Sequence, residues 1–265
     1  LLTENAGTAS DLTELVNLRD QSATRDVLWG GLASLSYLVA PDHQLRLNFL
    51  HNQCGTSSAR YLIGRLPEDD PNLILETRTV GYMERQLDAV QMIGFHKFGD
   101  GDSEGRFGRL YMNWGGSYTR TRQDEPDLRY FSNDFVVRGN DTIYDIQPSL
   151  YLRPTRFFRD LTEDNADLKV HFELPFAADK GRDGKVKFGS SALYKVRDFN
   201  ESRYDFETPE DTLQYTGDPV SFFAEENMGL IGTTGDGYNN DYGIYLIDAT
   251  ELRNSYRGNQ GIYAG

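Results

Sequence analysis

The chain has 265 residues and a formal net charge of −14, and this excess of acid disfavours nucleic-acid binding, which depends on Lys and Arg. Only 38% of the residues are hydrophobic, and no run approaches the roughly 20 apolar residues that a transmembrane helix needs. A transmembrane β-strand escapes that test, because only every second residue faces lipid.

The start of the chain supports two expectations, one about the extent of the protein and one about a short helix. Leu1–Asn5 has neither an initiating Met nor a basic and then apolar signal segment, so we expect the chain to be an internal piece of a longer protein. Ser10 and Asp11 are suited to cap a short helix over Leu12–Leu18, with Glu14 in the capping-box position.

Alternation of apolar and polar residues with period 2 then predicts six β-strands. They are Asp26–Val39, Gln44–Asn52, Gln86–Phe98, Arg109–Arg122, Ala166–Phe176 and Lys185–Arg197. Gln86–Phe98 alternates least regularly, and we expect a β-bulge there. Gly261–Gly265 looks like the start of a seventh strand.

The connections alternate between short and long. Pro41–His43, Gly99–Gly108 and Ala177–Gly184 have the composition of tight turns, whereas residues 56–77, 123–155 and 207–262 are expected to be long loops. Each short turn should join two antiparallel strands, so all the short turns should lie at one end of the sheet. Short turns at one end and long loops at the other are typical of outer-membrane β-barrels.

The alternation alone leaves open which face is covered. A soluble β-sandwich buries its apolar face, whereas a membrane barrel turns that face to lipid. The charged residues opposite the apolar ones favour the barrel, since a wet lumen tolerates Lys and Glu. We therefore expect the following apolar side chains on the convex side: Leu168, Val170, Phe172, Leu174, Val186, Phe188 and Tyr194. Lys169, His171, Glu173 and Lys187 should lie on the concave side.

No arrangement of residues predicts catalysis, a cofactor or a metal ion. The four His residues lack metal-ligand spacing, and Cys54, where a strand meets a loop, is expected to be a small, unreactive side chain and not a nucleophile. The acidic clusters 68–70, 100–104 and 236–241 resemble solvated turns more than calcium loops, because Tyr238 falls where an oxygen ligand belongs. We expect the chain not to be an enzyme, and a β-rich hydrolase is the weakest of the alternatives.

Aromatic residues of the last loop are the weak candidates for ligand binding. They are Tyr215, Phe222, Phe223, Tyr238, Tyr242 and Tyr245. Such rings can stack on a ligand such as a sugar, but packing of the loop onto itself is the favoured interpretation.

Four stretches in order along the chain resemble the barrel of TonB-dependent outer-membrane receptors. They are Asn48–Gln53 with Gly55–Tyr61, Glu76–Arg78 with Glu84–Arg85, Gln123–Phe131, and Pro154–Leu161. The resemblance covers roughly Asp26–Phe206 and is weakest in Leu1–Arg25 and Glu207–Gly265. It implies a 22-stranded barrel, of which residues 1–265 would hold about six strands and the start of a seventh.

The resemblance also implies a function and partners. We expect an all-β, antiparallel up-and-down section of a transmembrane barrel in the bacterial outer membrane, surrounded by lipid. The longer protein would contain a plug domain and would be energised by periplasmic TonB. Its ligand would be a scarce nutrient, such as a siderophore or another small molecule too large for porins. The alternative is a soluble β-sandwich that binds carbohydrate.

Overall fold

The computed structural model describes residues 2–5, 12–65, 72–99, 109–146, 153–178, 182–207, 213–233, 240–250, 255–257 and 261–264. These residues are almost entirely β-structure. The six long strands are β2 (Leu12–Ala40), β3 (His43–Arg65), β4 (Ile74–Phe98), β5 (Leu110–Arg138), β7 (Thr155–Ala178) and β8 (Arg182–Glu207). The short elements are β1 (Leu2–Asn5), β6 (Asp141–Asp145), α1 (Pro219–Phe222), η1 (Glu225–Asn227), β9 (Leu230–Thr233), β10 (Asn240–Tyr242), β11 (Tyr245–Asp248), β12 (Ser255–Arg257) and β13 (Gly261–Ala264).

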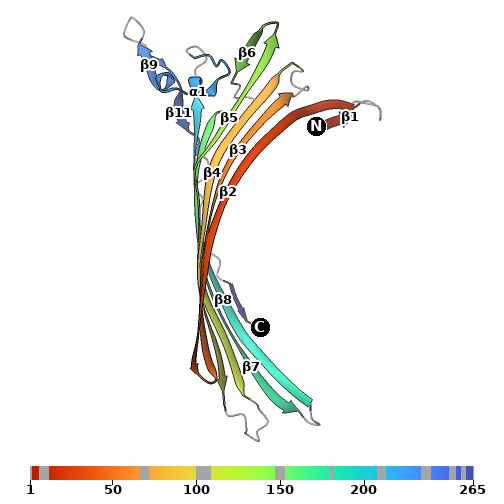
Figure 1. Cartoon of the computed structure of the whole chain (residues 1–265), viewed down its shortest axis with the longest axis vertical. Coiled ribbons are helices and arrows are strands. Elements are labelled where there is room, and N and C mark those ends of the chain that lie inside the picture. The colour runs from red at the N-terminus through yellow and green to blue at the C-terminus, as the bar shows by residue number, and fades with distance from the viewer. Residues whose placement is uncertain are drawn as a thin grey trace.

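The long strands form one antiparallel sheet in which neighbours in sequence are neighbours in space. The order is β1-β2-β3-β4-β5-β7-β8-β11, with β6 on β5 and with β12 and β13 on β8. The predicted all-β, up-and-down class is therefore confirmed, and the described strands form an open sheet (Figure 1). Each of the predicted pairings, β2 with β3, β4 with β5 and β7 with β8, is antiparallel.

The turn between β2 and β3 lies at the end of the sheet where β4 and β7 end and β5 and β8 begin. Pro41 and Asp42 form this two-residue turn, and Figure 1 shows it at that end. Residues 100–108 and 179–181, on which the other two predicted turns depend, lie outside the described part of the chain.

The expected long loops at 56–77 and 123–155 are wrong. β3 continues to Arg65, β4 begins at Ile74, and β5 continues to Arg138. At about 3.3 Å per residue, strands of 23 to 29 residues are roughly 75 to 95 Å long. The outer halves of these strands carry polar side chains on both faces, which removes the alternation that marks a strand in sequence.

The expected helix at Leu12–Leu18 is also wrong, because this segment begins β2 and pairs with β1 and, from Asn17, with β3. A seven-residue helix is marginal without tertiary packing, whereas the edge of β3 offers a row of hydrogen-bonding groups. Gly261–Ala264 does form a strand, β13, which pairs with β8.

An extra residue in β5 separates the two halves of the sheet. Between Asp124 and Arg129 the pairing of β5 shifts by one residue against β4, and a shift in the same segment occurs against β7. Pro126 lies in this segment, and a proline, which has no N–H, is tolerated inside a sheet at such a bulge. The bulge lies here and not within Gln86–Phe98, whose pairing on both sides is regular.

The register assigns the side chains to two faces. Tyr37, Leu45, Trp114 and Val170 occupy one row across the sheet, and the alternating residues of each strand continue this face. Beyond the bulge the same face carries Phe131, against which Tyr215 packs, and Tyr215 in turn contacts Phe222 of α1. Figure 1 shows α1 on the convex side of the sheet. The face that carries Leu168, Val170 and Phe172 is therefore the convex face, as predicted.

Candidate functional site

An exposed apolar band covers the convex face near the end with the short turns. The side chains that form it are 41% to 67% exposed: Val27, Trp29, Leu35, Tyr37, Leu47, Phe49, Val90, Met92, Phe98, Tyr118, Leu168, Val186, Phe188 and Tyr194. Phe172 of β7 stacks on Phe188 of β8 with ring centroids 5.0 Å apart. No second sheet or helix within the described ranges packs over this band. We call this surface the apolar band.

Polar residues replace the band toward the other end of the convex face. His51 lies 2.6 Å from Asp88, and the hydroxyl of Tyr118 donates to Asp164 at 2.6 Å. Arg120 also contacts Asp164, with 3.7 Å between nitrogen and oxygen. On β3, β4, β5 and β7 the apolar band therefore ends along a line of hydrogen-bonded and charged side chains, whereas on β2 it continues past this line to Trp29 and Val27.

The concave face of β7 and β8 differs from the convex face, whereas on β2 the concave face also exposes Leu28, Leu32 and Leu38. On the strands that carry the apolar band, the carboxylate of Glu173 forms ion pairs with Lys187 and Lys185, with nitrogen–oxygen distances of 2.8 Å and 3.3 Å. Farther along the same face, Glu163 pairs with Lys195 and Arg197 at 2.8 and 2.6 Å. One face of the same strands is thus apolar and the other is charged and ion-paired.

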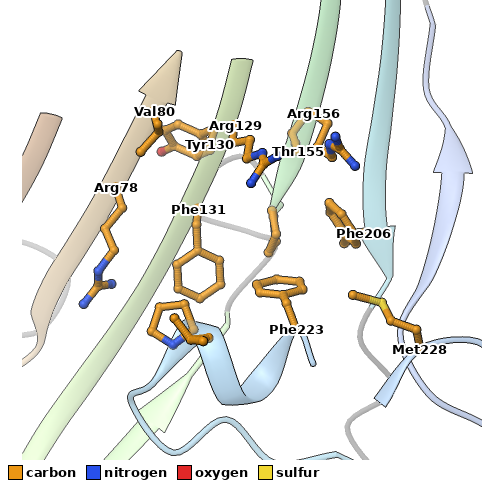
Figure 2. Close-up of a pocket in the computed structure, with 13 residues that line it drawn as sticks. Arg78, Val80, Arg129, Tyr130, Phe131, Thr155, Arg156, Phe206, Phe223 and Met228 are labelled. Atoms are coloured by element: carbon orange, nitrogen blue, oxygen red, sulfur yellow. The ribbon is translucent and has the colours of Figure 1, made fainter. Parts of the chain in front are cut away.

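A pocket lies on the convex face beyond the bulge, where residues 213–233 fold back against β4, β5 and β7. Its volume is about 490 Å³. Figure 2 shows Phe131 and Phe223 facing the pocket, with Phe206 and Met228 beside them and Arg129 and Arg156 on the wall above. Arg78 enters from β4 on the opposite side (Figure 2).

Arg78 is held by polar partners and by aromatic rings. It pairs with Glu76 at 3.0 Å and donates to the side-chain oxygen of Asn133 at 2.9 Å. Its guanidinium carbon lies 5.4 Å from the ring centre of Tyr61 and 6.0 Å from that of Phe131. The side chain of Glu76 is only 10% exposed, so this ion pair fixes Arg78 at the edge of the pocket.

Asp127, in the bulge, joins the other two arginines. Arg156 donates to it through two nitrogens at 2.8 Å each, and Arg129 donates at 2.7 Å. Burial alone would raise the pKa of Asp127, but the hydrogen bonds from Arg156 and Arg129 outweigh burial and hold this pKa below its ordinary value. The bulge thus places a carboxylate between two strands and orients two guanidinium groups at the pocket.

The predicted aromatic residues divide into three groups. Tyr215 and Phe222 are each 5% exposed and form the core of the folded-back segment with Phe131 and Ile244, as self-packing requires. Burial raises the pKa of the Tyr215 hydroxyl to about 12. Phe223 lines the pocket, Tyr242 and Tyr245 are 51% and 43% exposed, and Tyr238 lies outside the described residues.

The pocket arginines were missed by sequence reasoning. Arg78, Arg129 and Arg156 lie on three different strands, and the bulge decides which of them meet. The signal available in the sequence is that Arg78, Arg129 and Arg156 each lie in one of the four stretches singled out in the sequence analysis, in or beside the segments expected to be long loops.

No group of three or more His, Cys, Asp or Glu in the described ranges is placed to hold a metal ion. Among the helices of the same ranges, none has the length and hydropathy to cross a membrane. Comparison with known proteins identifies no matching family model and no matching curated protein.

Proposed function

We propose that this chain forms part of the wall of an outer-membrane β-barrel of the TonB-dependent receptor type, which takes up a nutrient too large for porins. The observation that carries the proposal is the apolar band, an exposed hydrophobic surface on the convex face of the sheet. Monomeric soluble proteins rarely expose large contiguous apolar patches.

The height of the apolar band supports a bilayer as its partner. On β7 the apolar side chains extend from Ala166 to Phe176, which is 11 residues or about 36 Å along the strand. A strand tilted by about 45° then crosses roughly 25 Å, the height of the lipid-facing band of outer-membrane barrels.

The ion pairs of the concave face support the same proposal. In a large barrel this face lines a wet lumen, where Lys and Glu remain solvated. The polar contacts of Glu173 and Glu163 therefore lie where a barrel can accommodate them. A β-sandwich would need a second sheet over the apolar band, and the described residues put none there.

The uptake function rests on the resemblance of four stretches to receptor barrels, and three of these stretches lie side by side on neighbouring strands. Asp127 of Gln123–Phe131 pairs with Arg156 of Pro154–Leu161. Arg78 of the second stretch lies over the ring of Phe131. The proposal therefore includes a plug domain and TonB as partners of the longer protein and a siderophore-like nutrient as its ligand.

The two tryptophans of the chain test the membrane assignment, because Trp29 and Trp114 both lie on the convex face. In phosphatidylcholine vesicles, brominated lipid should quench their emission strongly and aqueous iodide only weakly. The control is a chain with both tryptophans replaced by Phe and with Tyr111→Trp on the concave face of β5, for which the order of the quenchers should be reversed. Equal iodide quenching of both proteins would refute the proposal.

A further inference from the structure

We propose that the pocket beside α1 binds a small amphipathic anion, a flat apolar body that carries one carboxylate. This inference goes beyond the membrane role. It uses residues that lie on the convex face beyond the apolar band, and neither the strand pairing nor the resemblance assigns a ligand to them.

The base of the pocket is suited to the apolar body. Phe131 and Phe223 meet edge to face with centroids 5.5 Å apart, and Phe206 contacts Phe223 in the same way at 5.1 Å. Met228 adds a flexible thioether beside these rings. Aromatic and apolar side chains thus form one wall of the pocket, which suits a flat apolar group, and the volume of about 490 Å³ is within the usual range for small-molecule sites.

The polar side chains that line the pocket are mainly hydrogen-bond donors, so they suit a ligand with hydrogen-bond acceptors. Apart from the Thr155 hydroxyl and the Tyr130 phenol, the polar side chains of the lining are arginines, whose guanidinium groups donate hydrogen bonds and accept none. The Thr155 hydroxyl already donates to Asp205 at 2.9 Å. A neutral sugar, with as many donors as acceptors, would leave its donors unpaired here. A carboxylate only accepts, and it matches a guanidinium in shape and charge.

The charge around the pocket agrees with this assignment. Arg78, Arg129 and Arg156 face two carboxylates, Glu76 and Asp127, in a chain whose net charge is −14. Arg129 keeps 66% of its side chain exposed while it contacts Asp127. It is therefore the guanidinium most accessible to an incoming anion.

The position of the pocket favours a soluble ligand over a membrane lipid. On β4 the apolar band ends near Val90, and Val80 lines the pocket. Ten residues of strand separate the two, or about 33 Å along the strand. Lipid head groups that flank the apolar band would not extend this far.

The test is isothermal titration of the full chain in nanodiscs with 2-naphthoate and, for comparison, with the neutral 2-naphthamide. We expect naphthoate to bind at least about tenfold more tightly than the amide. Arg129→Gln should weaken naphthoate binding about tenfold, the usual effect of losing one charge-assisted hydrogen bond. Arg138→Gln, on the same strand but on the concave face, should leave binding unchanged.

Equal affinity for naphthoate and naphthamide would overturn the proposal, and this comparison needs no variant. Naphthoate binding that survives Arg129→Gln at full strength would also overturn it. Nanodiscs of zwitterionic and of anionic lipid should give the same affinity. If anionic lipid abolished naphthoate binding, the occupant would be a lipid head group and the soluble ligand would be ruled out.

Discussion

Asp134 couples the stability of the outer part of the sheet to pH. Its side chain is buried on β5 opposite Asp145 of β6, and one of its carboxyl oxygens has no partner among the described residues. Burial first and the charge of Asp145 second raise the pKa of Asp134 to about 6, from an ordinary value of 3.8. Below the ordinary value the folded and unfolded chains are both protonated. As pH rises from about 4 through 6, the folded chain must give up a proton that it holds more tightly than the unfolded chain does.

The free energy of unfolding should therefore fall over this pH range by up to about 3 kcal/mol, since one pKa unit corresponds to about 1.4 kcal/mol. Asp134→Asn removes the titrating group, so the variant should gain stability relative to the parent as pH rises from 4 to 7. Urea unfolding in micelles at pH 4.5 and 7 measures the difference. Asp141→Asn, an exposed carboxylate on the same hairpin, should leave the pH dependence unchanged. The same pH dependence of unfolding in Asp134→Asn and Asp141→Asn would contradict the account in which burial of Asp134 raises its pKa.

Gly94 illustrates how a single backbone position organises the apolar band. Trp114 lies across it from β5, and its indole N–H donates to Nε2 of His96 at 2.9 Å. A Cβ at position 94 would fall well inside the van der Waals distance of the Trp114 nitrogen. The sequence shows only a glycine in an apolar strand, so this dependence could not be predicted from it.

Gly94→Ala should displace Trp114 and destabilise the fold by about 1–3 kcal/mol, the usual cost of overpacking. Tryptophan emission and urea unfolding in micelles report the two effects. Gly115→Ala is the matched control, because a Cβ there meets its neighbours at an ordinary 3.8 to 3.9 Å. An unchanged emission spectrum in Gly94→Ala would contradict the close contact.

At the scale of the elements, hydrophobic alternation predicted the strands where the two faces differ in polarity. It paired β7 with β8 correctly from side chains such as Val170 and Lys169. It failed in residues 56–65 and 123–138, where both faces mix polar and apolar side chains and where Pro126 has the character of a loop residue. There the strands are specified by pairing with neighbours distant in sequence, which no local pattern contains.

The candidate site lies in the half of the sheet beyond the bulge, where hydrophobic alternation did not predict the strands. Arg129 reaches Asp127, and through it Arg156, only because the bulge inserts one residue into β5. Without the bulge, the side chains of one half of β5 would point to the opposite face of the sheet, since a shift of one residue exchanges the two faces of a strand. The aromatic residues of the last segment could be named from composition, but the arginines that meet them could not.

The two faces of β7 should differ in their tolerance of charge. Val170→Arg puts a guanidinium in the middle of the apolar band and should cost about 2–4 kcal/mol in a bilayer. His171→Arg, one residue farther on the concave face, should cost far less because that face is solvated. Urea unfolding from lipid vesicles measures both. Equal costs would mean that the two faces of β7 meet the same solvent.

At the scale of the whole molecule, the open sheet has two unlike edges. β8 is bordered by β11, β12 and β13, which pair with successive parts of it. β2 pairs with β1 only at its first residues, and from Asn17 to Ala40 its other edge has no partner in the described ranges. Backbone groups on such an edge cannot stay unpaired in lipid. In the proposed barrel, further strands of the longer protein would pair with this edge.

The central claim is that the convex face of this sheet meets lipid and the concave face meets water. The most direct measurement is a nitroxide scan of residues 168 to 173 of β7 in vesicles, with Cys54→Ser removing the native thiol. Labels at Leu168, Val170 and Phe172 should collide mainly with oxygen, and labels at Lys169, His171 and Glu173 with a water-soluble nickel complex. A period of two residues is the result that the barrel wall predicts. Equal access of the nickel complex to all six positions would contradict it.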